Sequence, residues 1–367
     1  MTPEVQPETG RAHAPVLVIG SASVHVARFV RGLCEAGQRV VLATHGELAI
    51  EPHPALVEAV TLDLGTTQWR APRQILDLAR RWSVRAIHAH QANSVGWHAA
   101  RAAHGSGVPL VLTLWGSDVL LLPSRSPFHR WMVCRALRGA SAWTADARML
   151  LEAADALAGP GRGPRQRCWI PLGVDEPDAA AAPPRERRIL SCRLHKPLYR
   201  VDAIVRAFAR LPTSCSGWTL EVAAAGSQTD ALKRLAVELG VAERVDFTGM
   251  LSPQALARSY RRAALFASVP TTDGTSVSLL EAMAAGCVPV LSDLPANREW
   301  VVDGLNGWLV GDLDHLDAAF VEAIAAWESG QWAQHGGHWN PQLIQRTARF
   351  ESNIQQFLAL YARLDAR

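Results

Sequence analysis

The residues from Asp273 to Gly286 have the types and order that bind a phosphate group. A predicted strand ending near Ser268 leads into a glycine-containing loop, and a short helix follows that stops at Gly286. In such a turn the unsatisfied N–H groups of the loop and the positive end of the helix dipole converge, which attracts an anion. Asp273 precedes the helix and Glu281 lies inside it, eight positions later. The segment therefore predicts a phosphate site.

Glu281 also has a second interpretation. Ser278-Leu279-Leu280-Glu281 fits a capping box, in which the glutamate only accepts a hydrogen bond from a backbone N–H at the start of a helix. Those four residues alone favour the capping box. The loop, the eight-residue spacing and the residues that follow together favour ligand binding.

The rest of the chain indicates two α/β domains. From Pro15 onward, short β-branched runs alternate with amphipathic helical segments, which is typical of parallel sheets covered by helices. Ligands of such doubly wound domains bind at the carboxyl ends of the strands, so function should lie on the loops there. Strands are expected at residues 16–19, 39–44, 57–62, 86–90, 110–114 and 168–170, and then at 189–192, 219–224, 245–248, 265–268, 288–291 and 308–310.

Composition places the domain boundaries. Residues 1–14 are rich in Pro, Glu and Thr and are expected to form a disordered tail without the apolar core of a signal peptide. The first domain is expected at 15–175, and a linker rich in Pro, Ala and charge at 176–187. The second domain then covers 188–340, and 341–367 should form one C-terminal helix that packs across both domains.

The composition also excludes several classes of function. With 37 basic and 34 acidic residues the net charge is +3, too even for a surface that neutralises nucleic-acid phosphate, so no nucleic-acid partner is expected. Apolar residues make up 49% of the 367, but no apolar run approaches the length of a membrane span. The six scattered cysteines lack metal-ligand spacing and indicate a reducing, cytoplasmic environment.

The motif resembles the signature of the retaining glycosyltransferases of family 4, also called glycosyl transferases group 1. That signature is an acidic residue, seven others, and Glu-Ala-Met-Ala-x-Gly-x-Pro-Val, which Asp273, Glu281 and residues 282–290 match in register. Residues 170–175 and 293–307 also resemble family segments, so the resemblance covers most of the chain. It implies the GT-B fold, in which two Rossmann-like domains face a central cleft.

The resemblance also implies roles for individual residues. Glu281 would bind the ribose hydroxyls of a nucleotide sugar, and Asp273 would reach the donor sugar. Backbone amides would hold the diphosphate, and they belong to Gly274, Thr275, Ser276 and Val277.

A cation should stabilise the diphosphate that leaves when the sugar–phosphate bond breaks. Family members use an Arg after the first strand of the second domain and a Lys a few residues later. Arg193 matches the Arg, but Tyr199 occupies the place of the Lys, between Lys196 and Arg200. Lys196 is taken as the candidate. No metal ion or cofactor is expected, because no acid-rich site is evident and GT-B enzymes generally work without a divalent ion.

The first domain carries weaker candidates. Ser23 and His25 lie in the loop after the first strand, which lacks a G-x-G-x-x-G fingerprint; His25 could bind a ligand or lie at the surface. Trp115 stands where many relatives carry a His, so Asp118 is the substitute candidate for contacting a sugar hydroxyl, with helix N-capping as its alternative. His90, near a strand end, could line the cleft or be a satisfied core histidine.

Residues 124–138 combine several arginines with Phe128, Trp131 and Met132. Such a helix can lie on an anionic membrane, where lipid-linked acceptors are found. Arg130 and Trp131 are adjacent, however, and adjacent residues do not share a helix face. A solvated helix with a buried apolar stripe is therefore favoured.

The resemblance predicts a hexosyltransferase that moves a sugar from a nucleotide-diphosphate sugar to a hydroxyl acceptor with retention of configuration. The acceptor would be lipid-linked or a glycan, in surface polysaccharide, glycolipid or related glycoconjugate synthesis, in the cytoplasm or at the inner face of the membrane. Two alternatives stay open: a GT-B nucleotide-sugar epimerase, and a catalytically inactive nucleotide-binding partner. A nicotinamide dehydrogenase is least favoured, because the glycine fingerprint is absent.

Overall fold

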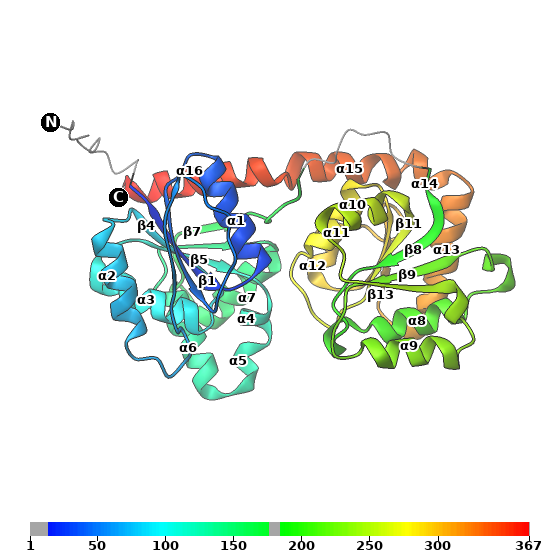
Figure 1. Cartoon of the computed structure of the whole chain (residues 1–367), viewed down its shortest axis with the longest axis horizontal. Coiled ribbons are helices and arrows are strands. Elements are labelled where there is room, and N and C mark those ends of the chain that lie inside the picture. The colour runs from blue at the N-terminus through cyan, green and yellow to red at the C-terminus, as the bar shows by residue number, and fades with distance from the viewer. Residues whose placement is uncertain (1–13, 176–183, 367) are drawn as a thin grey trace. The chain divides into compact units, whose positions relative to one another are not determined.

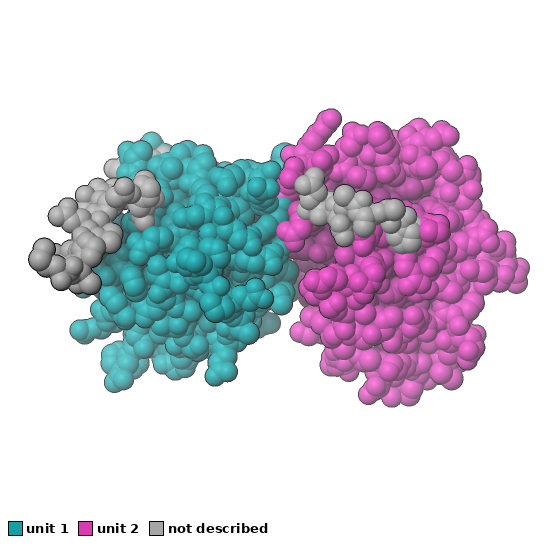
Figure 2. Space-filling model, turned by 45° about the horizontal axis from the view of Figure 1, so that its top comes forward, with its two compact units in different colours: residues 1–172, 350–367 teal, residues 173–349 magenta. Residues whose placement is uncertain are grey.

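The computed structural model describes residues 14–175 and 184–366 and divides into two compact units (Figure 2). Unit 1 comprises residues 1–172 and 350–367, and unit 2 comprises residues 173–349. The predicted tail, except for Ala14, lies outside the described residues, as does most of the predicted linker. No helix in the described ranges is long and apolar enough to cross a bilayer.

Unit 1 is built on a parallel sheet of seven strands in the order β3-β2-β1-β4-β5-β6-β7, with helices on its faces (Figure 1). The order reverses between β1 and β4, which is where doubly wound sheets bind ligands. The strands are β1 (Val16–Ser21), β2 (Val40–His45), β3 (Leu56–Thr61), β4 (Ala86–His90), β5 (Leu110–Leu114), β6 (Ala142–Ala145) and β7 (Gln166–Trp169). The helices are α1 (Val24–Glu35), α2 (Ala71–Arg81), α3 (Ser94–Ser106), α4 (Ser117–Leu120), α5 (Leu122–Arg125), α6 (Pro127–Arg138), α7 (Arg148–Ala158) and α16 (Phe350–Asp365).

The strands of unit 1 follow the apolar runs of the sequence. Every residue of β4 and β5 is buried, as expected for a parallel sheet covered on both faces, and both strands have the predicted bounds. The sequence prediction missed β6. Its four residues, Ala-Trp-Thr-Ala, include a single β-branched side chain, so the run has little strand signal of its own.

Unit 2 has a second parallel sheet, of six strands in the order β10-β9-β8-β11-β12-β13. All six were predicted, and the order reverses between β8 and β11. The strands are β8 (Glu186–Ser191), β9 (Thr219–Ala223), β10 (Val245–Gly249), β11 (Ala263–Ser268), β12 (Val288–Ser292) and β13 (Trp308–Val310). The helices are α8 (Val201–Ala209), α9 (Thr229–Glu238), α10 (Pro253–Arg262), α11 (Val277–Ala284), α12 (Pro295–Arg298), α13 (Leu316–Glu328), α14 (Gln331–Gln334) and α15 (Gly336–Thr347).

The prediction of one C-terminal helix over 341–367 is wrong. The segment belongs to two helices, α15 in unit 2 and α16 in unit 1. The helix stops because the backbone at Ala348 and Arg349 pairs with Val174: the Val174 N–H donates to the Ala348 carbonyl at 2.8 Å, and Val174 bridges Arg349. α16 then packs on α1, where a Cβ on Gly32 would lie 2.6 Å from the Phe350 ring. This close approach needs glycine at position 32.

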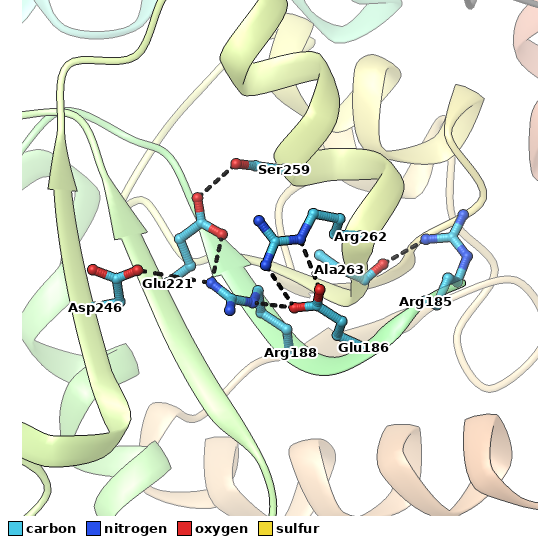
Figure 3. Close-up of polar contacts among 8 residues, drawn as sticks. All are labelled: Arg185, Glu186, Arg188, Glu221, Asp246, Ser259, Arg262 and Ala263. Carbon is cyan, nitrogen blue, oxygen red and sulfur yellow. Dashed lines mark hydrogen bonds and ion pairs between the residues drawn. The ribbon is translucent and has the colours of Figure 1, made fainter. Parts of the chain in front are cut away.

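The predicted linker is also too long at its carboxyl end, because β8 already begins at Glu186. A network of charged groups holds this end of the strand (Figure 3). Arg188 in β8 donates to Glu221 of β9 at 3.0 Å and to Glu186 at 3.1 Å, and Arg262 of α10 pairs with Glu186 at 2.8 Å. The other Glu221 oxygen accepts the Ser259 hydroxyl at 2.6 Å. The network joins β8, β9 and α10.

Replacing Glu221 by Ala should destabilise unit 2 by about 3 kcal/mol, because it removes the buried carboxylate from the half-buried Arg188 guanidinium and leaves the Ser259 hydroxyl without its acceptor. Hydrogen exchange of the β8 and β9 amides measures the effect on unit 2 alone. Asp246 faces the same Arg188 at 3.8 Å from an exposed position, so Asp246→Ala is the matched control and should cost at most about 1 kcal/mol. Equal losses in the two variants would contradict this role for Glu221.

Candidate functional site

The loop after β11 and the start of α11 form the predicted phosphate-binding segment. Gly274, Thr275 and Ser276 are buried, and the Thr275 hydroxyl accepts the Trp300 indole N–H at 3.0 Å, which fixes the loop. Within residues 14–175 and 184–366, no group accepts a hydrogen bond from the N–H of Val277 or Ser278. These first amides of the helix are therefore available to an anion.

The position of α11 decides between the two interpretations of Glu281. The N-cap position of the helix is Ser276, and Glu281 is the fifth helical residue, too late to be the third-position partner of a capping box. The capping-box interpretation is therefore wrong. The half-buried Glu281 carboxylate instead lies beside the Tyr260 hydroxyl, whose pKa is raised by burial and by the neighbouring Cys192 and Glu281.

Arg193 connects the loop after β8 to the loop after β11. Its Nη2 donates to Asp273 Oδ2 at 2.7 Å, and its Nη1 donates to the Ser278 hydroxyl at 3.3 Å and to the hydroxyl of Ser276. The guanidinium also lies 4.4 Å from the centre of the Tyr199 ring, a cation–π contact. The structure thus brings together Arg193, Asp273 and Ser276, which the sequence placed in one site from segments far apart.

Burial sets the electrostatics of this pair. Burial raises the pKa of Asp273, and Arg193 with the Gly274 N–H offsets only part of that increase. For Arg193, burial acts to lower the pKa, but Asp273 and Tyr199 hold the pKa above its ordinary value. The guanidinium is therefore a fixed positive charge next to the free amides of α11, the arrangement that stabilises charge developing on phosphate oxygens.

The three residues near the expected Lys position differ in their surroundings. Lys196 is exposed and forms no ion pair in the described part of the chain. The Arg200 side chain donates to the carbonyls of Val269 and Pro270 at 2.7 and 2.8 Å. Tyr199 is the one that contacts Arg193, so the place of the Lys is taken by an aromatic ring and a hydroxyl.

Sequence reasoning missed three residues of this site. Ser278 was considered only as a capping residue, although it shares the first turn of α11 with Ser276. Tyr260 and Trp300 reach Glu281 and Thr275 from α10 and from the segment after α12. No local pattern marks these two, because their roles depend on contacts with distant segments.

In unit 1, Trp115 lies between two imidazole rings. His25 contacts it edge-on with ring centres 5.5 Å apart, and His90 does so at 5.6 Å. The three residues follow or end β1, β4 and β5, and so lie at the carboxyl ends of neighbouring strands. Ser23 has a separate role, because its hydroxyl caps α1 by accepting the Val26 N–H at 3.3 Å.

Asp118 positions the loops around Trp115. Its Oδ2 accepts the Ala92 N–H at 2.7 Å and its Oδ1 accepts the Trp115 N–H at 3.1 Å. The residue is 2% exposed, and burial raises its pKa despite these hydrogen bonds. It lies inside α4, whose N-cap is Gly116, so it does not cap that helix. The carboxylate ties the loop after β4 to the loop after β5, which favours a positioning role over direct sugar contact.

His90 and His88 differ although both are buried on β4. His88 is the satisfied core histidine, with Tyr361 at 2.5 Å and Thr113 at 2.6 Å on its two nitrogens. Neither nitrogen of His90 has a partner among the described residues. Burial, with a smaller contribution from His25, lowers the pKa of His90 to about 3. The His90 imidazole is therefore neutral at physiological pH.

Two family models match the chain, one in each unit. The model for "Glycosyl transferases group 1" matches residues 186–327, which contain Arg193, Asp273 and Glu281. The model for "Glycosyl transferase 4-like" matches residues 16–147, which contain His90 and Trp115. The chain belongs to the glycosyl transferases of group 1.

Known proteins resemble this group 1 chain in sequence and in fold. A D-inositol 3-phosphate glycosyltransferase from Nocardia farcinica is 33% identical over 138 residues, which are 36% of this chain and 30% of that relative. The match thus spans under a third of the relative's length. HepE from Anabaena, solved in complex with UDP, covers 95% of this chain and 100% of its own, with a TM-score of 0.76 and 17% identity. Sucrose-phosphate synthase from Thermosynechococcus elongatus has a TM-score of 0.77 at 19% identity, over 96% and 99% of the two chains. The chain has the predicted GT-B fold.

The stability of unit 1 should fall on acidification, because the unfolded chain protonates its histidines near pH 6.5 while folded His90 resists to about pH 3. The contribution is complete above pH 6.5 and is lost as the pH falls below it, by about 2 kcal/mol at pH 5. His90→Phe keeps the ring contacts and should remove the His90 part of this dependence, while the part that comes from His88, whose pKa burial also lowers, should remain. The measurement is hydrogen exchange of the β4 and β5 amides at pH 7 and pH 5.

The matched control is His104→Gln, at an exposed position on α3. It should keep the wild-type pH dependence. If the stability of His90→Phe depends on pH as strongly as that of wild type, the pKa of His90 in the folded protein is not lowered as its burial requires.

Proposed function

We propose that this glycosyltransferase-family chain transfers a hexose from a nucleotide-diphosphate sugar to a hydroxyl acceptor with retention of anomeric configuration. The observation that carries the proposal is the cluster in unit 2, where the Arg193 guanidinium lies beside the unpartnered first amides of α11. A fixed cation and free helix amides at one point suit a diphosphate. The UDP complex of HepE, a protein of the same fold, supports a nucleotide ligand.

The proposal assigns a role to each group of the cluster. Glu281 accepts hydrogen bonds from the ribose hydroxyls, and the amides of Val277 and Ser278 hold the phosphates, since the Gly274 N–H already donates to Asp273 at 3.1 Å. Arg193 stabilises the charge that develops on the leaving diphosphate. Asp273 holds Arg193 in position and contacts the donor sugar with its remaining acceptor capacity.

Retention is proposed on the resemblance to family 4, with the acceptor attacking on the same face from which the phosphate leaves. No side chain is assigned as a nucleophile, and the leaving phosphate accepts the proton of the acceptor hydroxyl. We assign no metal ion, because Arg193 and the α11 amides carry the positive charge that a divalent ion would supply.

On the acceptor side we assign the His25, Trp115 and His90 cluster of unit 1, with Asp118 positioning it. The acceptor class is a lipid-linked or glycan hydroxyl, and the process is the cytoplasmic synthesis of surface polysaccharide, glycolipid or a related glycoconjugate. The indole of Trp115 replaces the His of many relatives. Its half-exposed ring offers an apolar face to a sugar rather than a hydrogen-bonding nitrogen.

The first test is donor binding, measured by thermal shift with nucleoside diphosphates and their sugars. A true donor at about a hundred times its Kd should raise the Tm by roughly 5–10 °C. Glu281→Ala should weaken that binding about ten-fold or more, since it removes a charged acceptor from the ribose. Glu238→Ala, exposed on α9 of the same unit, is the control and should bind as wild type.

The panel also separates the alternatives. If the protein converts a nucleotide sugar to its epimer without an acceptor, its activity is epimerisation and not transfer. Binding that depends on Glu281, without turnover of any donor in the presence or absence of acceptors, would favour the inactive partner. No stabilisation by any member of the panel, in folded protein, would contradict the whole proposal.

A second test concerns the charge on the leaving group. Arg193→Lys keeps a cation but cannot bind Asp273 through one nitrogen and the serines through another, as the guanidinium does. The value of kcat should therefore fall about a hundred-fold while the protein stays folded. EDTA should leave the wild-type rate unchanged. A rate that survives Arg193→Lys but not EDTA would assign the role of Arg193 to a metal ion instead.

A further inference from the structure

The surface formed by α3 and α6 of unit 1 has cations and no exposed carboxylate. Between residues 91 and 145 the sequence has one carboxylate, Asp118, which is buried and bonded to backbone amides. Within the described ranges, neither Arg125, Arg130 nor Arg135 forms an ion pair, and all three are exposed. The same stretch has five arginines, namely Arg101, Arg125, Arg130, Arg135 and Arg138. This surface is therefore complementary to an anionic partner.

Three aromatic rings gather on the same surface. Trp97 of α3 contacts Phe128 and Trp131 of α6, with ring centres 6.3 and 5.9 Å apart, and the last two rings are 6.0 Å apart. Phe128 is 47% exposed and Trp131 is 51% exposed. The rings of Phe128 and Trp131 lie outside the core of unit 1. The side of α6 that packs inward carries Met132, Val133, Ala136 and Leu137.

The helix geometry places rings and cations on one outer face. Trp131 lies three residues after Phe128 and four before Arg135, so these three side chains share a face of α6. On α3, the Arg101 guanidinium lies 5.2 Å from the centre of the Trp97 ring. The adjacency of Arg130 and Trp131 favoured a solvated helix, but Arg135 supplies a cation on the same face as the rings. The α3–α6 surface is defined by Trp97, Arg101, Phe128, Trp131 and Arg135.

We propose that the α3–α6 surface binds the headgroup region of an anionic bilayer. The indole and phenyl rings would enter the interface, where amphipathic aromatic side chains are most stable, and the arginines would contact lipid phosphates through long side chains. An anionic leaflet supplies the opposite charge to every free cation of this surface. Figure 1 shows α3, α5 and α6 on the side of unit 1 away from α16, and this binding does not depend on the sugar chemistry proposed above.

The experiment is vesicle co-sedimentation of the full chain. Wild type should bind vesicles of phosphatidylcholine mixed with phosphatidylglycerol, should not bind phosphatidylcholine alone, and should release as salt rises. The double change Phe128→Ala with Trp131→Ala should weaken binding about ten-fold. Arg101→Gln with Arg135→Gln should weaken binding about thirty-fold at low salt.

The controls are matched changes in unit 2. Trp339→Ala removes a tryptophan that is 46% exposed on α15, and Arg206→Gln with Arg234→Gln removes two exposed cations. These variants should bind vesicles as wild type does. Equal Tm values for all variants verify that the helices are intact.

Several outcomes would overturn the proposal. These are no binding of wild type to the anionic vesicles at low salt, or folded α3–α6 variants that bind as tightly as wild type. If only the arginine changes weaken vesicle binding, the part of the proposal in which the aromatic rings enter the interface is wrong. A mass in solution twice that of the chain, halved by the aromatic changes, would make this face a contact between two copies. Binding of single-stranded RNA in preference to the vesicles would make it a nucleic-acid surface.

Discussion

The half-buried contact between Arg193 and Asp273 is the constraint on which the site in unit 2 depends. The two side chains follow β8 and β11, the neighbouring strands at which the strand order reverses. Two other sets of contacts join the same loops: the Thr271 N–H donates to the Leu198 carbonyl at 2.9 Å, and Arg200 donates to the carbonyls of Val269 and Pro270. The Arg193 guanidinium adds the link to the helix, because one nitrogen binds Asp273 while the other reaches Ser276 and Ser278 at the start of α11. The planar guanidinium thus joins the acid to the first turn of α11, where the free helix amides lie.

Unit 1 joins its loops through a different acid. Asp118 accepts backbone N–H groups from Ala92 and Trp115, and so binds the loops after β4 and β5 instead of pairing with a cation. The reversal of strand order lies between β1 and β4, and His25 and His90 stand on its two sides, with Trp115 between their rings. Each unit therefore collects its polar candidates at its own topological switch point, but unit 2 offers a fixed positive charge and unit 1 offers a cluster of aromatic and imidazole rings.

The surface of α6 shows how a helix can have two apolar faces with different purposes. Its inward face fills the core of unit 1, whereas Phe128 and Trp131 contact Trp97 of α3 at the surface. Exposed rings cost solubility unless they meet a partner, and the absence of exposed carboxylates between residues 91 and 145 narrows that partner to an anionic one.

The sequence by itself determined the parallel α/β class, most strands and the strand–loop–helix turn that contains Asp273, since these follow from short-range periodicity and from a motif contiguous in the chain. It also pointed to Arg193, through a resemblance. Only the tertiary structure decided that Glu281 lies too far along α11 to cap it and that Asp118 is buried. It alone split the C-terminal segment into two helices at Ala348, through a hydrogen bond from Val174. Each of these depends on where a helix begins or on a partner many residues away, and local pattern contains neither.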